Sequence, residues 1–347
     1  MDQLASIPFN VLVMDPPETG IPERLAQYRD VAWLGARSAI TVLPSVASLK
    51  ALRQYAKTSH ATKPYLGIGN PLLDGTQGDL LLGDYYKELA EFARTKRCSQ
   101  MPTTPQQIAS VPGLPSARDF VSMLIFRGAH ADIESIRSQV PLPETADELC
   151  EIARRLGVPE SDILLGADAT ETRLKDLSDQ GRLADYAIVH FATHGTLTGQ
   201  VKGLAEPGLI LTPPPRGTSD PKALERDDGY LTASEITTLK LNADWVVLSP
   251  CNTAAPQDEG AEALSGLARA FFYAGARALL VSHWAVGSDA AVKLTTRAFT
   301  ELKVHPEIGR AEAMRISMRE LIENGLLDEV HPRMWAPFVV VGEGAAR

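Results

Sequence analysis

Residues 186–191 read YAIVHF, and this nearly continuous apolar stretch decides the fold. It has the length of one strand and no alternation of polar and apolar residues, which is typical of a central strand covered on both faces. Residues 245–248, WVVL, form a second stretch of the same kind. Strands buried on both faces belong to parallel sheets with helices packed against each side. The sequence therefore predicts an α/β fold.

The rest of the chain alternates between strand and helix signals. Strands are predicted at 9–13, 38–43, 65–68, 163–165, 278–282 and 338–341. Helices are predicted at 45–55, 85–96, 145–157, 170–177, 232–239 and from about 264 to Gly275. Thr145 followed by Glu148 has the spacing of a capping box at a helix start. The signal is weakest over 77–143, which we interpret as the join between two halves.

Composition and charge exclude several classes of protein. The chain has 347 residues, 44% of them hydrophobic and 22% charged, as in a folded globular protein. The net charge is −9 and the basic residues are scattered, so a direct nucleic-acid partner is not expected. The apolar stretches are far shorter than the roughly 20 residues that span a bilayer, and the first residues do not resemble a secretory signal. We predict a cytoplasmic protein that does not enter a membrane.

The sequence contains three cysteines, Cys98, Cys150 and Cys251. Their odd number and wide spacing argue against a disulfide framework and against paired-cysteine zinc motifs. We expect Cys98 and Cys150, each on a predicted helix, to be inert buried thiols. Arithmetic leaves at least one cysteine free, and Cys251 stands where a thiolate would be useful.

Two reactive side chains follow the two buried strands. His194 comes directly after the first strand and Cys251 directly after the second. The carboxyl ends of parallel strands meet at one edge of a sheet, so neighbouring strands would bring the imidazole and the thiol together. An imidazole beside a thiol favours the thiolate and can later protonate a leaving amine. Gly195 lets the backbone turn and, with the N–H of Cys251, would form an oxyanion hole.

Residues 190–195, HFATHG, and 247–254, VLSPCNTA, closely resemble the two signature segments of CHAT domains. These domains belong to the caspase-like clan of cysteine peptidases, together with caspases and separase. The resemblance continues through 264–276, 282–286 and 335–338, and over 4–13 and 33–49 near the N-terminus. It implies a caspase-like three-layer sandwich, a mainly parallel sheet with helices on both faces. It also implies an N-terminal pseudo-caspase half, residues 1–140, and a catalytic half, residues 141–347.

The resemblance also assigns roles. It implies that His194 is general base and acid, that Cys251 is the nucleophile, and that the N–H groups of Gly195 and Cys251 bind the oxyanion. It implies a protein substrate and no metal or other cofactor. Family members usually carry a further strand and loop before the segment matching 4–9 and often follow helical repeats. We therefore expect a fragment of a longer protein, controlled by a helical-repeat region or a regulatory protein.

Other acidic and imidazole side chains have simpler interpretations. Asp258 and Glu259 follow the cysteine, where some relatives bind an arginine or lysine of the substrate, although carboxylates also suit the start of a helix. A basic cleavage specificity is therefore only a hypothesis. His190 lies within its strand and is assigned to packing or a hydrogen bond, and His283 to structural support. The stretch 211–230, with Arg216, Lys222 and Arg226, is interpreted as a flexible surface connection.

Two different functions remain as alternatives. A catalytically silent regulatory or scaffold module would keep the same fold, and the presence of both His194 and Cys251 counts against it. An amidotransferase-like hydrolase would place its cysteine at a glycine-flanked elbow, whereas Pro250 and Asn252 flank Cys251. The sequence favours an endopeptidase that works by acyl transfer.

Overall fold

A seven-stranded sheet forms the centre of the protein, in the order β1-β13-β12-β11-β6-β2-β5. The structure is a computed structural model, and it describes residues 8–17, 20–43, 60–75, 83–100, 124–127, 130–196, 201–202, 206–249, 260–284 and 288–345. The sheet strands are β1 (Thr41–Val42), β2 (Lys63–Gly69), β5 (Ile163–Leu165), β6 (Tyr186–Ala192), β11 (Trp245–Leu248), β12 (Ala278–Ser282) and β13 (Phe338–Gly342). Every neighbouring pair is parallel except β12 with β13.

Two small three-stranded sheets accompany the large one. One contains β7 (Gly195–Thr196), β9 (Gly208–Ile210) and β10 (Tyr230–Thr232). The other contains β3 (Leu124–Arg127), β4 (His130–Ala131) and β8 (Val201–Lys202). The first of these matters for function, because its strand β7 begins at Gly195.

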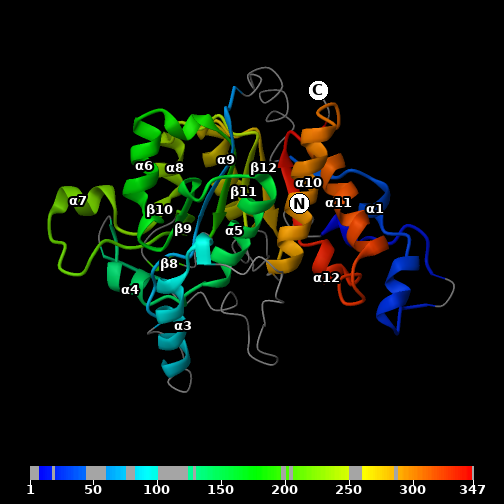
Figure 1. The fold of residues 1–347 in the computed structure, drawn as a ribbon, viewed down its shortest axis with the longest axis horizontal. Coiled ribbons are helices and arrows are strands. Elements are labelled where there is room, and N and C mark those ends of the chain that lie inside the picture. The colour runs from blue at the N-terminus through cyan, green and yellow to red at the C-terminus, as the bar shows by residue number, and fades with distance from the viewer. Residues whose placement is uncertain are drawn as a thin grey trace.

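Helices cover both faces of the large sheet, so the predicted fold class is confirmed (Figure 1). The helices are α1 (Leu34–Arg37), α3 (Gly83–Thr95), α4 (Ile133–Arg137), α5 (Glu144–Leu156), α6 (Glu171–Asp179), α7 (Pro221–Arg226), α8 (Ala233–Thr238), α9 (Gly260–Ala274), α10 (Ser288–Val304), α11 (Arg310–Asn324) and α12 (Pro332–Trp335). Short 3-10 turns are η2 (Phe9–Val11), η3 (Leu25–Asp30), η4 (Cys98–Gln100), η6 (Glu160–Asp162), η7 (Gly166–Asp168) and η8 (Arg182–Asp185). In the described part of the chain, no helix is long and apolar enough to cross a bilayer.

The core consists of two apolar layers, one on each face of the sheet. Alternate strand residues such as Ile188 and Val247 face the layer made with α5, α10 and α11. Their neighbours Val189 and Leu248 face the layer made with α6, α8 and α9. Because both faces are buried, the strands carry apolar residues at nearly every position, which is the pattern seen in the sequence. In the two central strands β6 and β11, His190 is a fully buried polar exception.

Helix α5 packs unusually close to strand β2. A β-carbon built on Gly69 would lie 2.6 Å from the backbone oxygen of Ala192 and 2.7 Å from the Leu149 side chain. Real β-carbons do not approach other atoms so closely, so glycine is the residue that this contact requires. The close approach brings the inward face of α5 against the end of β6, where the histidines lie.

Most predicted elements are present, with two corrections. Residues 9–13 form the 3-10 turn η2 and an isolated bridge between Val13 and Trp33 instead of a strand. Thr145 does not cap α5: its hydroxyl donates to the Leu142 carbonyl at 2.7 Å and accepts from the Asn70 N–H at 2.8 Å. The capping box is therefore wrong, because Thr145 and Glu148 are buried and serve tertiary contacts. The helix predicted at 45–55 lies outside the described residues.

The division at residue 140 remains a prediction. The position lies between α4 and α5. The large sheet takes β1 and β2 from before it and its other strands from after it.

The expectation of two unpaired thiols is wrong for Cys98 and Cys150. They form a disulfide that joins η4 to α5, with their α-carbons 5.2 Å apart. Cysteines separated by 52 residues give no pairing signal in the sequence, and only the packing of η4 against α5 brings them together. Disulfides are more typical of oxidising compartments, so cysteine usage no longer supports a reducing one. Of the three cysteines, Cys251 is the one outside this pair.

We expect the Cys150→Ser variant to be less stable than the wild type in the absence of reductant. A crosslink across a loop of this size restricts the unfolded chain and typically contributes about 2–4 kcal/mol. Urea unfolding with and without dithiothreitol measures the difference, which should vanish when the wild type is reduced. Cys251→Ser is the matched control and should keep its sensitivity to dithiothreitol. Equal stabilities of Cys150→Ser and oxidised wild type would contradict the prediction.

Candidate active site

The two strands that precede His194 and Cys251 are neighbours. β6 and β11 pair in parallel, with Val247 opposite His190 and Leu248 opposite Phe191. Both strands therefore end at the same edge of the sheet, as the sequence predicts. His194 and Gly195 lie just beyond β6 at this edge. Cys251, Asp258 and Glu259 lie outside the described residues, so the meeting of thiol and imidazole stays a prediction.

The imidazole of His194 is held by a backbone carbonyl. The ring is buried, with 2% of the residue exposed, and its Nε2 lies 2.7 Å from the oxygen of Val140. A carbonyl oxygen only accepts hydrogen bonds, so Nε2 carries the proton. In the neutral ring, Nδ1 is then the nitrogen that accepts a proton. The contact thus selects the tautomer of a general base as well as the orientation of the ring.

Val140 contacts the candidate catalytic imidazole, and sequence reasoning missed it. It contributes through its backbone oxygen, and every residue type offers the same oxygen. No side-chain motif could have indicated it. Its role follows only from the path of the chain between α4 and α5.

The backbone of His194 and Gly195 is fixed by strand β9. The Ile210 N–H donates to the His194 carbonyl at 2.9 Å, and Gly195 pairs with Leu209 in the antiparallel ladder. The Thr193 hydroxyl also donates to the Ile210 carbonyl. These contacts hold the peptide after the imidazole in one orientation. The orientation of the Gly195 N–H is therefore set by β-sheet hydrogen bonding, as an oxyanion donor requires.

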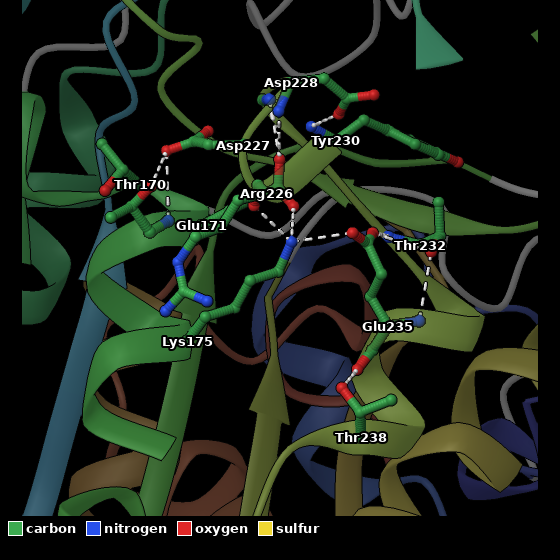
Figure 2. Close-up of polar contacts among 12 residues, drawn as sticks. Thr170, Glu171, Lys175, Arg226, Asp227, Asp228, Tyr230, Thr232, Glu235 and Thr238 are labelled. Carbon is green, nitrogen blue, oxygen red and sulfur yellow. Dashed lines mark hydrogen bonds and ion pairs between the residues drawn. The ribbon is translucent and has the colours of Figure 1, made fainter. Parts of the chain in front are cut away.

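A buried ionic cluster ties the connection between β9 and β10 to helix α6 (Figure 2). Glu171 on α6 accepts from the N–H groups of Asp228 at 3.0 Å and Gly229 at 2.8 Å. Lys175 lies 2.7 Å from Glu171 and 2.8 Å from Glu235 on α8. The cluster anchors β10, which pairs with β9, which in turn holds His194. The support of the imidazole thus reaches helices on the far side of the sheet from α5.

The stretch 211–230 is not the loose connection expected from its composition. It contains α7, and Arg226 pairs with Asp176 at 2.6 Å and Asp179 at 3.0 Å. Arg216 pairs with Asp74 at 2.8 Å. Its prolines and charges suggested a flexible loop, but ion pairs to distant parts of the chain hold it in place. Those partners are far away in sequence, so the composition gave no sign of them.

Burial raises the pKa of the Glu171 carboxyl from 4.5 to about 8. Lys175 lowers it, while the carboxylates of Glu235 and Asp228 raise it further. The folded state therefore keeps a proton that the unfolded chain releases near pH 4.5. The resulting stability is fully present below this pH and is lost as the pH rises through about 8.

We expect the stability advantage of the wild type over Glu171→Gln to fall as the pH rises. Glutamine does not titrate, so the difference between the two proteins isolates this carboxyl. The slope is at most about 1.4 kcal/mol per pH unit. Urea unfolding at several pH values between about 5 and about 9 measures it, with the exposed Glu88→Gln as control for the substitution itself. A difference that stays constant with pH would rule out the raised pKa.

Two other histidines occupy this edge. His190 makes side-chain hydrogen bonds within the sheet layer, to Tyr65 at 2.9 Å and Ser249 at 3.0 Å, so its assignment to a hydrogen bond is confirmed. His283 follows β12 and is buried, and its backbone N–H donates to the Pro337 carbonyl at 2.8 Å.

Three comparisons relate the chain to known proteins. The CHAT domain profile matches residues 1–343. Tetratricopeptide repeat protein 28 of Mus musculus is 28% identical over 235 residues, covering 58% of this chain and 9% of that protein. The chain thus spans about a tenth of this relative's length. Among solved structures, the Arg-specific cysteine proteinase gingipain R superimposes with a TM-score of 0.34 at 12% identity, covering 58% of this chain and 42% of that one.

Proposed function

Because this chain belongs to the CHAT-domain family, we propose that it is a cysteine endopeptidase with Cys251 as nucleophile and His194 as general base. The observation that carries the proposal is the hydrogen bond between His194 Nε2 and the Val140 carbonyl at 2.7 Å. It gives the imidazole the tautomer of a base, at the edge of the sheet where the strand leading to Cys251 also ends.

The reaction follows from these positions. The Cys251 thiol gives its proton to Nδ1 of His194, and the thiolate attacks the carbonyl carbon of the substrate peptide. The N–H groups of Gly195 and Cys251 hold the oxyanion of the tetrahedral intermediate. The C–N bond then breaks as His194 returns the proton to the leaving amine. Water, deprotonated by the same imidazole, attacks the thioester and releases the acid and the free thiol.

Control of the enzyme by a partner is part of the proposal. The name of the mouse relative refers to tetratricopeptide repeats, which are helical, and this chain spans only a small part of that protein. We propose that a helical-repeat region or a regulatory protein presents substrates to this domain. A catalytically silent scaffold is the competing function. Labelling of Cys251 by a peptidyl electrophile separates it from the peptidase.

We expect a peptidyl chloromethyl ketone to label Cys251 in the wild type and to label His194→Ala at least about tenfold more slowly near neutral pH. Without His194 the thiol keeps its proton and is a poor nucleophile. Mass spectrometry of tryptic peptides measures the rate and identifies the modified cysteine. His305→Ala, which changes an exposed histidine directly after the end of α10, is the matched control and should react like the wild type. Equal labelling of wild type and His194→Ala would favour the silent scaffold.

The proposal extends to a preference for arginine or lysine before the scissile bond, with Asp258 and Glu259 as the binding carboxylates. We expect cleavage of a peptide library after basic residues, and loss of this preference in Asp258→Asn with Glu259→Gln. The two amides keep the shape of the side chains and remove their charge. Cleavage after neutral or acidic residues would exclude these carboxylates as the specificity site.

A further inference from the structure

A buried polar cluster lies within the apolar layer between the sheet and α5. It consists of Tyr65, Glu148, His190 and Ser249, of which the first three are fully buried and the last is 3% exposed. His190 is at its centre: Nδ1 lies 2.9 Å from the Tyr65 hydroxyl, and Nε2 lies 3.0 Å from the Ser249 hydroxyl and 3.3 Å from Glu148 Oε1.

The directions of these hydrogen bonds follow from the acceptors. The Glu148 carboxylate accepts but does not donate, so the proton of the His190 ring belongs on Nε2. Nε2 then donates toward Ser249 with Glu148 beside it, and Nδ1 accepts from the Tyr65 hydroxyl. This arrangement of protons satisfies the two hydrogen bonds of the His190 ring, to Tyr65 and Ser249, which fix the orientation of the imidazole.

The cluster joins the two strands that lead to the catalytic residues. His190 lies on β6 four positions before His194, and Ser249 follows β11 two positions before Cys251. Because His190 pairs with Val247, its side chain reaches diagonally across the ladder to Ser249, on the same face of the sheet. The bond between them therefore spans the two strand ends at the point where both chains leave the sheet.

Helix α5 connects this cluster to the imidazole of His194. Glu148 comes from the second turn of α5, and Val140, which holds His194, lies just before the helix begins. The helix and the segment that leads into it, residues 140–148, therefore contact both histidines. The position of α5 is fixed by the disulfide at Cys150 and by the close packing of Leu149 against Gly69.

Stability alone does not explain a carboxylate and an imidazole in this layer. A buried charge loses several kcal/mol of hydration, and apolar side chains of the same size often stabilise a core equally well or better. Burying polar groups does restrict the geometry, because each hydrogen bond is satisfied in few arrangements. In this cluster, the hydrogen bonds define the distance between the ends of β6 and β11.

We infer that the four residues of this cluster, Tyr65 included, are positioning residues that hold the chain leading to Cys251 in register with His194. The inference rests on the proposed dyad of Cys251 and His194. It adds a second set of groups on which the reactivity of the Cys251 thiol depends. In this role they act through the backbone on either side of the strand ends and take no part in the chemical steps.

Alkylation of Cys251 by iodoacetamide in the oxidised 347-residue chain tests this without a known substrate, since the other two cysteines are joined in the disulfide. The rate is measured as a function of pH for the wild type, His194→Ala, Glu148→Gln and Tyr65→Phe. The last two variants are nearly isosteric: Glu148→Gln removes the negative charge beside His190, and Tyr65→Phe removes a hydrogen bond to it. Glu329→Gln is the matched control, because Glu329 is also a buried carboxylate but lies between α11 and α12, where it pairs with Lys293 of α10. Circular dichroism and thermal unfolding verify that each variant is folded.

We expect the midpoint of the alkylation profile to move upward by about half a pH unit or more in Glu148→Gln and Tyr65→Phe, which slows the reaction about threefold at pH values below the midpoint. His194→Ala should move it further, and Glu329→Gln should follow the wild type. A merely structural role would lower the melting temperature without moving the midpoint.

The results distinguish the positioning role of the cluster from the catalytic dyad itself. If His194→Ala moves the midpoint while folded Glu148→Gln and Tyr65→Phe follow the wild type, the positioning role is overturned and the dyad stands. If one of these two variants does not fold, the other alone decides. If His194→Ala itself leaves the profile unchanged, the dyad is overturned, and the inference that rests on it is overturned as well.

Discussion

The parallel pairing of β6 with β11 is the constraint on which the rest of the structure depends. Its register sets Leu248 opposite Phe191, so the chain leaves both strands at the same level of the sheet. Parallel strands need a crossover between them, and here the crossover contains β9, β10, α7 and α8. The same segment that makes the pairing possible therefore supplies the strand that fixes His194.

The site is supported from both faces of the sheet. On one face, the segment before α5 brings the Val140 carbonyl to His194, and α5 itself brings Glu148 to His190. On the other, Glu171 anchors the segment that returns to β10. The sheet separates these two supports, and they meet where β6 ends, at His194. A general base needs such fixed surroundings, since proton transfer depends on the distance and direction of the ring nitrogen.

Helix α5 also shows how one element can serve packing and chemistry together. Its apolar residues fill the core layer, and Gly69 allows it to approach β2 closely. Its polar residues Thr145 and Glu148 have the spacing of a helix cap, but both point inward and serve tertiary contacts. A local motif predicts local bonds only when no stronger partner lies across the interface, and here such partners were present.

The sequence by itself determined the α/β class, the strands at its centre and the position of His194, Gly195 and Cys251 after two of them. The physical reason is that these signals are local in the sequence. Apolar runs of strand length and glycine turns can be recognised without knowing what packs against them. Only the tertiary structure decided that β6 and β11 are neighbours, that the Val140 carbonyl selects the tautomer of His194, and that Cys98 bonds to Cys150. These contacts join residues distant in sequence, one of them through a backbone atom common to every residue type, so no spacing or side-chain pattern encodes them.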